Sequence, residues 1–402
     1  MYRYPRELVM AYKVLMLGWE LYPFNSGGLG EACLGLANAL SKKGIDLTFV
    51  LPRKVDITVD GFRVVFADVD EDILKTLGAY TTSPLWSHII NRDELPPDFV
   101  RAAFKYAEKM KKLVKKQKAD IIHTHDWMTY PSGVMAKSYL KKPMVAHVHS
   151  TEYDRTGGYY PNPYVYKIEK EGLLSSDRVL PVGGFMKEIL VKNYGVDEQK
   201  IRVVYNGINE DFGKRLPPAL TKFKELGFKI VLFLGRITLQ KGPEYFVRAA
   251  KLVSAYNPKT LFVVAGSGDM DGYMMSEAAR LGVMDKFLFT GFLRGNERNQ
   301  IFQSADIFVM PSVSEPFGIV ALEAAISGTP VLVSKQSGVA EVMKNILKAD
   351  FWDIEEMANK ILAVLKFDAL PQDLKWESGK EVRNFSWSRA ADEVINVYDQ
   401  LI

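Results

Sequence analysis

The sequence is poor in cysteine, in long apolar runs and in excess charge. Cys33 is the single cysteine among 402 residues, which excludes an intrachain disulfide and a metal cluster built from cysteines. No apolar run reaches the roughly 20 residues of a membrane-spanning helix, and residues 1–12 lack the apolar segment of a secretory signal. The net charge of +4 is small for this length, so nucleic acid is not an expected partner. We therefore expect a cytoplasmic protein.

The chain has the length and composition of a globular protein with two domains. Hydrophobic residues make up 48% and charged residues 25% of the sequence, and a single core rarely extends beyond about 250 to 300 residues. Both halves alternate short apolar runs with helix-like runs, a pattern typical of a parallel, doubly wound α/β sheet. A segment with linker character, 213–218, separates them. We predict a first domain over 1–212 and a second over 213–384.

The apolar runs predict the strands. In the first half they lie at 13–18, 45–51, 62–67, 120–127, 143–150, 178–181 and 201–205. In the second half they lie at 230–235, 260–265, 286–290, 307–310 and 330–334, and after Glu341 the chain passes to a helix without a further strand.

Four of the five histidines lie on two neighbouring apolar runs. His123 and His125 share one face of the first predicted strand, and His147 and His149 share one face of the next. Zinc is one interpretation, but the chain has neither a second cysteine nor a helical His-Glu-x-x-His, so we expect no metal. We place His125, Asp126 and His149 in a cleft where the two strands end.

Gly27 and Gly28 stand just before a helix expected at 31–43. Glycine lets the backbone approach an anion at a helix N-terminus, where unpaired N–H groups favour phosphate. The loop lacks the spacing of a dinucleotide fingerprint and the Lys-Ser/Thr of a P-loop. A phosphate or sugar contact and an ordinary turn both remain open.

Charge recurs in two further segments of the first half. Four lysines share one face of a helix expected at 99–118: Lys105, Lys109, Lys112 and Lys116. They predict a solvated face, with docking on an anionic membrane as the alternative. Asp68 and Asp70 form an Asp-x-Asp that could hold a metal bound to a diphosphate, although such pairs are common in acidic turns.

Residues 151–164 combine aromatic side chains, carboxylates and glycine. Such a segment could stack on and hydrogen-bond to a carbohydrate. An ordinary ordered loop would have the same composition.

Charged residues of the second half lie in loops that follow predicted strands. Arg236 and Lys241 share one loop, and two cations so close together suit a diphosphate without a metal. Glu315 lies in another loop at the strand edge where open α/β sheets bind ligands. Glu323 follows in an apolar helix, where a ligand hydroxyl or a salt bridge must satisfy its charge.

These motifs resemble a known family. Gly235-Arg236 with Lys241-Gly242, and Glu315-Pro316-Phe317-Gly318 with Glu323, resemble the donor site of retaining glycosyltransferases of the two-domain GT-B fold. The resemblance implies two doubly wound Rossmann-like domains that face each other across a cleft.

The first half adds a narrower resemblance. The Gly27-Gly28-Leu29 loop, the His125-Asp126-Trp127 segment and His149 are similar to those of glycogen and starch synthases. The tail, 385–402, resembles the family's last helix, which returns to the first domain.

The resemblance also implies roles for residues of the second domain. Arg236 and Lys241 would hold the donor diphosphate, Glu323 the ribose, and Glu315 would face the transferred sugar. The same site would include Phe317 and Gly318.

In the first domain, the resemblance implies that Asp126 and His149 contact the sugar. Gly27 and Gly28 would bring backbone N–H groups to the phosphates. The donor is a substrate, UDP-glucose or ADP-glucose, and no cofactor is implied.

Two departures from the family pattern stand out. Asn25 occupies the position where bacterial glycogen synthases usually carry lysine, two residues before the glycine pair. The usual turn and strand after Glu341 are not recognisable.

We therefore expect an enzyme that extends an α-1,4-glucan from a nucleotide-activated glucose. Two alternatives are a transferase of the same fold that acts on a small sugar, a sugar phosphate or a membrane lipid, and a catalytically silent sugar-binding protein. The sequence does not fix the oligomeric state.

Overall fold

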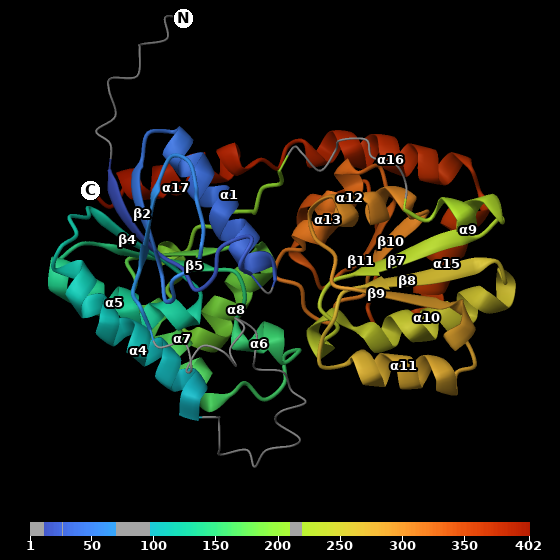
Figure 1. The fold of residues 1–402 in the computed structure, drawn as a ribbon, viewed down its shortest axis with the longest axis horizontal. Helices are drawn as coiled ribbons and strands as arrows, with labels where there is room; N and C mark the ends of the chain where they lie inside the picture. Colours follow the sequence, from blue (N-terminus) through green and yellow to red (C-terminus); the bar gives the residue numbers. More distant parts are fainter. Residues whose placement is uncertain (1–11, 26, 70–96, 210–218) are drawn as a thin grey trace, which may run out of the picture.

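The computed structural model describes residues 12–25, 27–69, 97–209 and 219–402. They form two lobes, each built around a parallel sheet of six strands with helices on both faces (Figure 1). The first sheet consists of β1 (Lys13–Leu17), β2 (Asp46–Leu51), β3 (Arg63–Phe66), β4 (Ile121–His125), β5 (Met144–Val148) and β6 (Arg178–Pro181). The second consists of β7 (Lys229–Leu234), β8 (Thr260–Ala265), β9 (Phe287–Gly291), β10 (Ile307–Met310), β11 (Val331–Ser334) and β12 (Leu347–Ala349).

Both sheets have the same doubly wound topology. The order of the first is β3-β2-β1-β4-β5-β6, and that of the second is β12-β11-β10-β7-β8-β9. The winding reverses between β1 and β4 in one lobe and between β7 and β10 in the other. In such sheets the loops at the carboxyl ends of the strands, beside this reversal, form the ligand crevice. The predicted pair of doubly wound sheets is confirmed.

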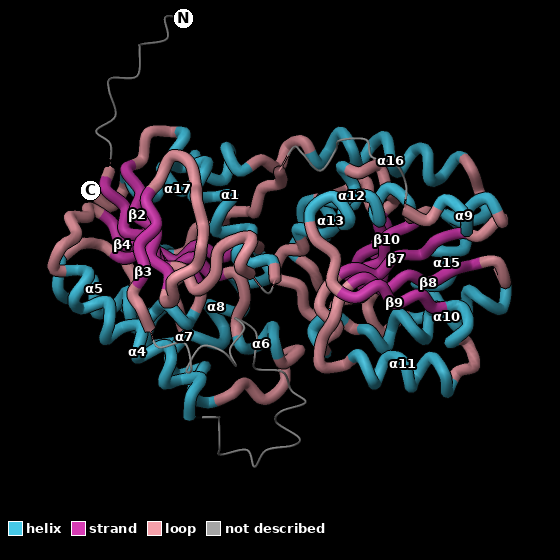
Figure 2. The backbone as a smooth tube through the Cα atoms, in the orientation of Figure 1, coloured by secondary structure: helices cyan, strands magenta, loops and turns pink. Residues whose placement is uncertain are grey.

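Helices cover both faces of each sheet (Figure 2). In the first lobe they are α1 (Gly28–Lys42), α4 (Pro97–Val114), α5 (Tyr130–Leu140), α6 (Glu152–Arg155), α7 (Pro163–Ser175) and α8 (Gly184–Tyr194). In the second they are α9 (Thr221–Glu225), α10 (Pro243–Tyr256), α11 (Asp271–Arg280), α12 (Gly295–Ser304), α13 (Ile319–Ile326), α14 (Gly338–Val342), α15 (Ile354–Lys366) and α16 (Ala369–Val382). None of the described helices combines the length and the apolarity that crossing a bilayer requires.

The last helix, α17 (Trp387–Asp399), lies against α1 of the first lobe (Figure 1). Trp387 fills the space beside Gly35, where an added Cβ atom would lie 2.2 Å from the indole ring. Near the other end of α17, the Tyr398 hydroxyl lies 2.6 Å from Nδ1 of His123, in the central strand β4. The end of the chain is therefore packed into the lobe that carries its beginning.

Some sequence-based boundaries were wrong. The second sheet has a sixth strand, β12, which pairs with β11 through Leu332 and Leu347, so the strand after Glu341 is present although only three residues long. Residues 201–205 do not form a strand, since only Ile201 makes a single bridge, to Val179. The predicted lysine-rich helix ends at Val114. The proposed domain boundary at residues 212 and 213 lies outside the described part of the chain.

Candidate functional site

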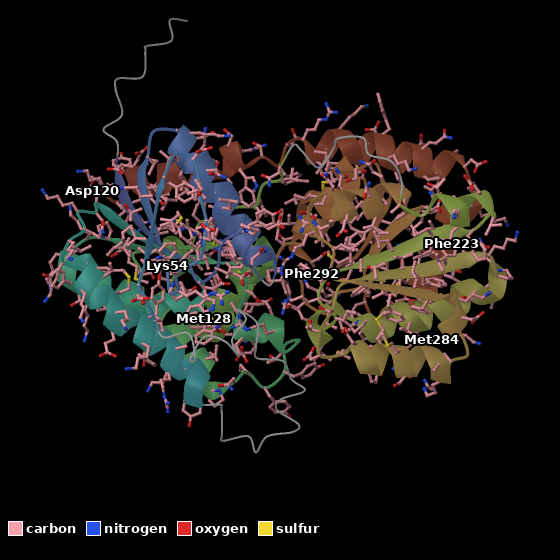
Figure 3. All side chains as sticks on the ribbon, in the orientation of Figure 1. Lys54, Asp120, Met128, Phe223, Met284 and Phe292 are labelled. Carbon is pink, nitrogen blue, oxygen red and sulfur yellow. The ribbon has the colours of Figure 1, made fainter. Side chains whose placement is uncertain are left out.

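A cleft between the lobes collects the strand-end loops of both sheets. Of the residues predicted to form a site, nine line this cleft, and His125 and Asp126 are buried beside it: Gly27, Gly28, His149, Arg236, Lys241, Glu315, Phe317, Gly318 and Glu323 are the lining residues. Phe292, at the inner end of the second lobe, also lines it (Figure 3). The residues meet because β1, β7 and β10 end beside the two points where the winding reverses.

The loop after β7 holds the two predicted cations, and its lysine is ion-paired. Lys241 Nζ contacts Glu315 Oε2, from the loop after β10, and the Ser312 hydroxyl donates to the same oxygen at 3.2 Å. Gly242 has a φ of 64°, and an added Cβ atom would lie 2.2 Å from the Pro311 carbonyl oxygen. Only glycine allows the two loops to approach so closely. A cation and a carboxylate are thereby fixed together in the cleft.

The segment after Glu315 reaches the cleft mainly through its backbone. Gly318, at φ 101°, starts α13, and an added Cβ atom would lie 2.8 Å from the Met310 side chain. The ring of Phe317 is buried and packs against Tyr205 and Phe385, with centroids 5.9 and 6.4 Å away. Phe317 therefore contributes to the contact between the lobes as well as to the cleft wall.

Glu323 is buried in α13 and has one charged partner. Its Oε1 accepts a hydrogen bond from Arg298 Nη2 at 2.7 Å, and Arg298 also binds Glu31 of α1. Burial raises the pKa of Glu323 to about 7, although the Arg298 charge acts in the opposite direction. Arg298 and Glu31 line the cleft but were missed by sequence analysis, because nothing in either helix pattern sets them apart from surface charges.

The glycine loop lies at the start of α1. Gly27 is the N-cap and Gly28 the first helical residue, and an added Cβ atom at Gly28 would meet nothing within 4 Å. Asn25 Nδ2 donates to the Gly27 carbonyl oxygen at 2.6 Å. Asn25 therefore shapes this loop, whereas a lysine there would have added a charge.

Asp126 lies behind the cleft, where it holds the neighbouring loop. It is buried at a φ of 59°, and its Oδ1 accepts from the backbone N–H groups of His149 and Ser150, at 2.6 and 3.3 Å. Burial raises the pKa of its carboxyl to about 7, against the lowering by the His149 N–H group. The carboxylate fixes the position of His149.

The four histidines form a stacked, buried group, as the strand alternation predicted. The ring centroids of His123 and His125 are 4.7 Å apart, and those of His147 and His149 are 4.5 Å apart. Burial lowers the pKa of His149 to about 3, so its imidazole is neutral at neutral pH. Within the described chain, Nδ1 of His149 has no hydrogen-bond partner. His149 can therefore contact a hydroxyl group without carrying charge.

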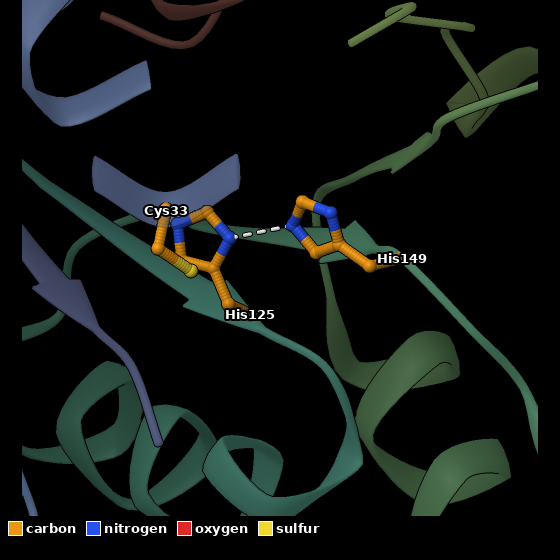
Figure 4. A group of neighbouring side chains, drawn as sticks. All are labelled: Cys33, His125 and His149. Carbon is orange, nitrogen blue, oxygen red and sulfur yellow. Dashed lines mark hydrogen bonds between the residues drawn. The ribbon is translucent and has the colours of Figure 1, made fainter. Parts of the chain in front are cut away.

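One corner of this group brings together three groups that could bind a metal. Cys33, His125 and His149 each offer one ligand atom within 4.8 Å of the others (Figure 4). A metal would have to replace the 2.9 Å hydrogen bond between the two imidazoles. It would also require the Cys33 thiolate, whereas burial raises the pKa of this thiol well above its usual value. The expectation of no metal here stays a prediction.

The Asp-x-Asp segment adds no group to the cleft that the structure describes. Asp68 is not among the residues that line the cleft, and Asp70 lies outside the described chain.

The aromatic segment after β5 contacts the second lobe at its base and exposes tyrosines beyond it. Asp154 Oδ1 accepts from the Ser314 hydroxyl at 2.8 Å, a buried hydrogen bond between the lobes. An added Cβ atom at Gly157 would lie 3.2 Å from Val313. Tyr159 and Tyr164 are 71% and 51% exposed.

Comparison with known proteins identifies the family. The model "Glycosyltransferase Family 4" matches residues 26–212, and "Glycosyl transferases group 1" matches 221–380. An uncharacterized glycosyltransferase of Methanocaldococcus jannaschii is 34% identical over 96% of this chain and 97% of its own. The chain belongs to this family of glycosyltransferases.

Two further comparisons agree with the fold and with the resemblance seen in the sequence. A glycogen synthase of Mycobacterium tuberculosis is 27% identical over 96% of this glycosyltransferase and 94% of its own length. The crystal structure of HepE from Anabaena in complex with UDP-glucose has 17% identity and superposes with a TM-score of 0.72, covering 97% of this chain and 100% of that one. The glycosyltransferase therefore has the GT-B fold.

Proposed function

We propose that this glycosyltransferase is a retaining enzyme that moves glucose from UDP-glucose or ADP-glucose to the non-reducing end of an α-1,4-glucan, as a glycogen synthase does. The observation that carries the proposal is the cleft itself. It combines the cations Arg236 and Lys241 with a helix N-terminus at Gly27 and Gly28. Two cations and the backbone N–H groups of a helix N-terminus are suited to a diphosphate.

The donor would lie across the second lobe. Arg236 and Lys241 would neutralise the diphosphate, and Lys241 would exchange part of its contact with Glu315 for a phosphate oxygen. Glu315 would then face the glucosyl ring, and Glu323 would accept a hydrogen bond from the ribose. Because the two side chains supply the positive charge, we propose that no metal is needed.

The transfer exchanges one bond at the anomeric carbon for another. The bond from this carbon to the diphosphate oxygen breaks, and its electron pair leaves with the nucleoside diphosphate. The acceptor hydroxyl oxygen forms the new bond on the same face of the sugar, and its proton passes to the departing phosphate oxygen. Arg236 and Lys241 would stabilise the negative charge that develops on this leaving group.

Residues of the first lobe would orient the glucosyl group. The neutral imidazole of His149 would hydrogen-bond to a sugar hydroxyl, and Asp126 would act one step away by holding the His149 backbone. We therefore propose Asp126 as a positioning residue.

The glucan acceptor is supported by similarity and by the aromatic segment. The tyrosines Tyr159 and Tyr164 follow the loop whose base contacts the second lobe through Asp154. Aromatic faces stack on the apolar faces of sugar rings, so exposed tyrosines in this segment suit a carbohydrate chain.

A second candidate acceptor is a lipid-linked sugar at an anionic membrane. One observation favours it: α4 exposes Phe104, at 52%, together with Lys112 in its last turn, and Lys116 is exposed just beyond its end. Exposed apolar and cationic side chains together favour an anionic lipid surface.

The test is release of nucleoside diphosphate from UDP-glucose and from ADP-glucose, each with glycogen, with anionic liposomes that carry a sugar-linked lipid, or with neither. Labelled glucose is traced into the glycogen chains, and EDTA is included in a parallel series. Each assay compares the wild type with Lys241→Ala, and the variant Lys251→Ala, which removes an exposed lysine of α10 outside the cleft, is the control for charge.

Release that depends on glycogen, with label in its chains, would support the proposal and identify the donor. Release that depends on the liposomes would move the proposal to the lipid acceptor. The absence of release and of nucleotide-sugar binding would contradict both. Activity that EDTA removes would contradict the metal-independent reaction.

A further inference from the structure

Arg298 lies between two carboxylates that belong to different lobes. Its Nη1 and Nη2 atoms donate to both oxygens of Glu31, at 2.8 and 3.0 Å, and Nη2 also donates to Glu323 Oε1 at 2.7 Å. Glu31 lies in the first turn of α1, next to the glycine loop, and Glu323 lies in α13. One guanidinium therefore connects the helix of the glycine loop with the carboxylate proposed to bind ribose.

The second oxygen of Glu323 is unsatisfied. The side chain of Glu323 is 3% exposed, and Oε2 has no hydrogen-bond partner among the described residues. Burying a carboxylate oxygen without a partner is unfavourable, so such an atom in a ligand cleft indicates a missing donor group. The ribose hydroxyls of a nucleotide-sugar can donate a hydrogen bond to this oxygen, whereas its ionised phosphates cannot.

We propose that Arg298 is a positioning residue for the nucleoside of the donor: it occupies one oxygen of Glu323 and leaves the other for a ribose hydroxyl, while Glu31 holds the guanidinium in place from the first lobe. This inference rests on the proposed function. It adds to that function a specific coupling between the lobes, because the ribose contact depends on a carboxylate of the opposite lobe.

The charges around the pair explain why Arg298 is needed. Burial and the nearby Glu31 raise the pKa of Glu323, and Arg298 lowers it. The groups that face Arg298 are Glu323, Glu31 and, at longer range, the Tyr22 phenol. Without the guanidinium, Glu323 takes up a proton at higher pH and no longer presents two acceptor oxygens.

The experiment compares binding of two ligands that differ only in the ribose hydroxyls. Calorimetry measures the affinity for whichever nucleoside diphosphate the wild type binds, UDP or ADP, and for its 2′,3′-dideoxy analogue. The variants are Arg298→Gln and Glu31→Gln. Arg280→Gln is the matched control, because Arg280 forms a similar two-point pair with Glu277 on α11, outside the cleft.

We expect the wild type and Arg280→Gln to prefer the natural diphosphate by roughly tenfold to a hundredfold, the range for a hydrogen bond to a charged group. Arg298→Gln should lose most of this preference. As the pH is lowered, its affinity for the natural diphosphate should begin to fall at a higher pH than the affinity of the wild type. The affinity of Arg298→Gln for the dideoxy analogue should be nearly the same as that of the wild type. A general disruption of the fold would weaken binding of both ligands. If Arg298→Gln does not fold, Arg298→Lys, which keeps the charge but not the two-point contact, takes its place and should lose part of the preference.

Two other outcomes can be distinguished. If wild type binds neither diphosphate, the proposed function fails. If wild type prefers the natural diphosphate and the folded Arg298 variant keeps the full preference, the donor site stands and this inference is overturned.

Discussion

Replacing Asp126 tests whether one buried carboxylate positions the sugar-facing side of the cleft. In Asp126→Ala the N–H groups of His149 and Ser150 lose their acceptor. Each unsatisfied buried donor costs about 1 to 3 kcal/mol. We expect a loss of about 4 kcal/mol in the free energy of unfolding.

The matched variant Asp126→Asn keeps an acceptor oxygen and has nearly the same shape as the aspartate it replaces. It removes only the buried charge, so at neutral pH we expect its free energy of unfolding to be at least as large as that of the wild type. Glucosyl transfer should fall by roughly a hundredfold in Asp126→Ala, since small displacements of positioned groups have effects of this size. The fall should be smaller in Asp126→Asn.

The pH dependence gives a further check. Burial raises the pKa of Asp126 from 3.8, its value in an unfolded chain, to about 7 in the folded protein. Between these two pH values the folded protein keeps a proton that the unfolded chain has released. The stability of the wild type relative to Asp126→Asn should therefore fall as pH rises from about 4 to about 7 and then level off.

Urea unfolding and nucleoside diphosphate release measure these quantities. Equal stability of Asp126→Ala and Asp126→Asn would refute the role of the two backbone hydrogen bonds. If the difference in free energy of unfolding between the wild type and Asp126→Asn does not change across this pH range, burial does not raise the pKa of the Asp126 carboxyl.

Three other predictions concern contacts around the cleft. The double replacement of Tyr159 and Tyr164 by alanine should raise the KM for glycogen several-fold without changing release from the donor in water, measured by steady-state kinetics; an unchanged KM would argue against stacking. Glu341→Ala should lower the free energy of unfolding, measured in urea, by about 1 kcal/mol, because the Glu341 carboxylate caps α8 of the opposite lobe by accepting from the Gly184 N–H group at 2.8 Å. Equal stability of this variant and the wild type would contradict the capping role. Arg155→Met should lower the free energy of unfolding by about 4 kcal/mol by the same method, since it removes the cation that two buried carboxylates share. A decrease below about 1 kcal/mol would contradict that expectation.

The strand-end loops could be predicted from the sequence because short apolar runs fix where parallel strands end. Arg236, Lys241 and Glu315 follow such runs directly, and the shared edge of a doubly wound sheet brings them together. The pairing of the histidines followed from strand alternation in the same way.

Contacts that depend on how the lobes pack could not be predicted. Arg298 and Glu31 are 267 positions apart, and each occupies an ordinary polar position of its helix. The acceptance by the Asp126 carboxylate of the His149 backbone N–H group also depends on how neighbouring loops meet, which the sequence pattern does not reveal. The strand β12 has only three residues, too few for a periodic signal.

The central claim is that the cleft binds the diphosphate of a nucleotide-glucose donor. Its most direct test is calorimetric titration of UDP-glucose and ADP-glucose into the wild type, Lys241→Ala and Lys251→Ala. We predict that the wild type and Lys251→Ala bind one donor equally well and that Lys241→Ala binds it about a hundredfold more weakly, since a charged contact to phosphate is lost. Equal binding by all three proteins, or no binding by the wild type, would contradict the claim.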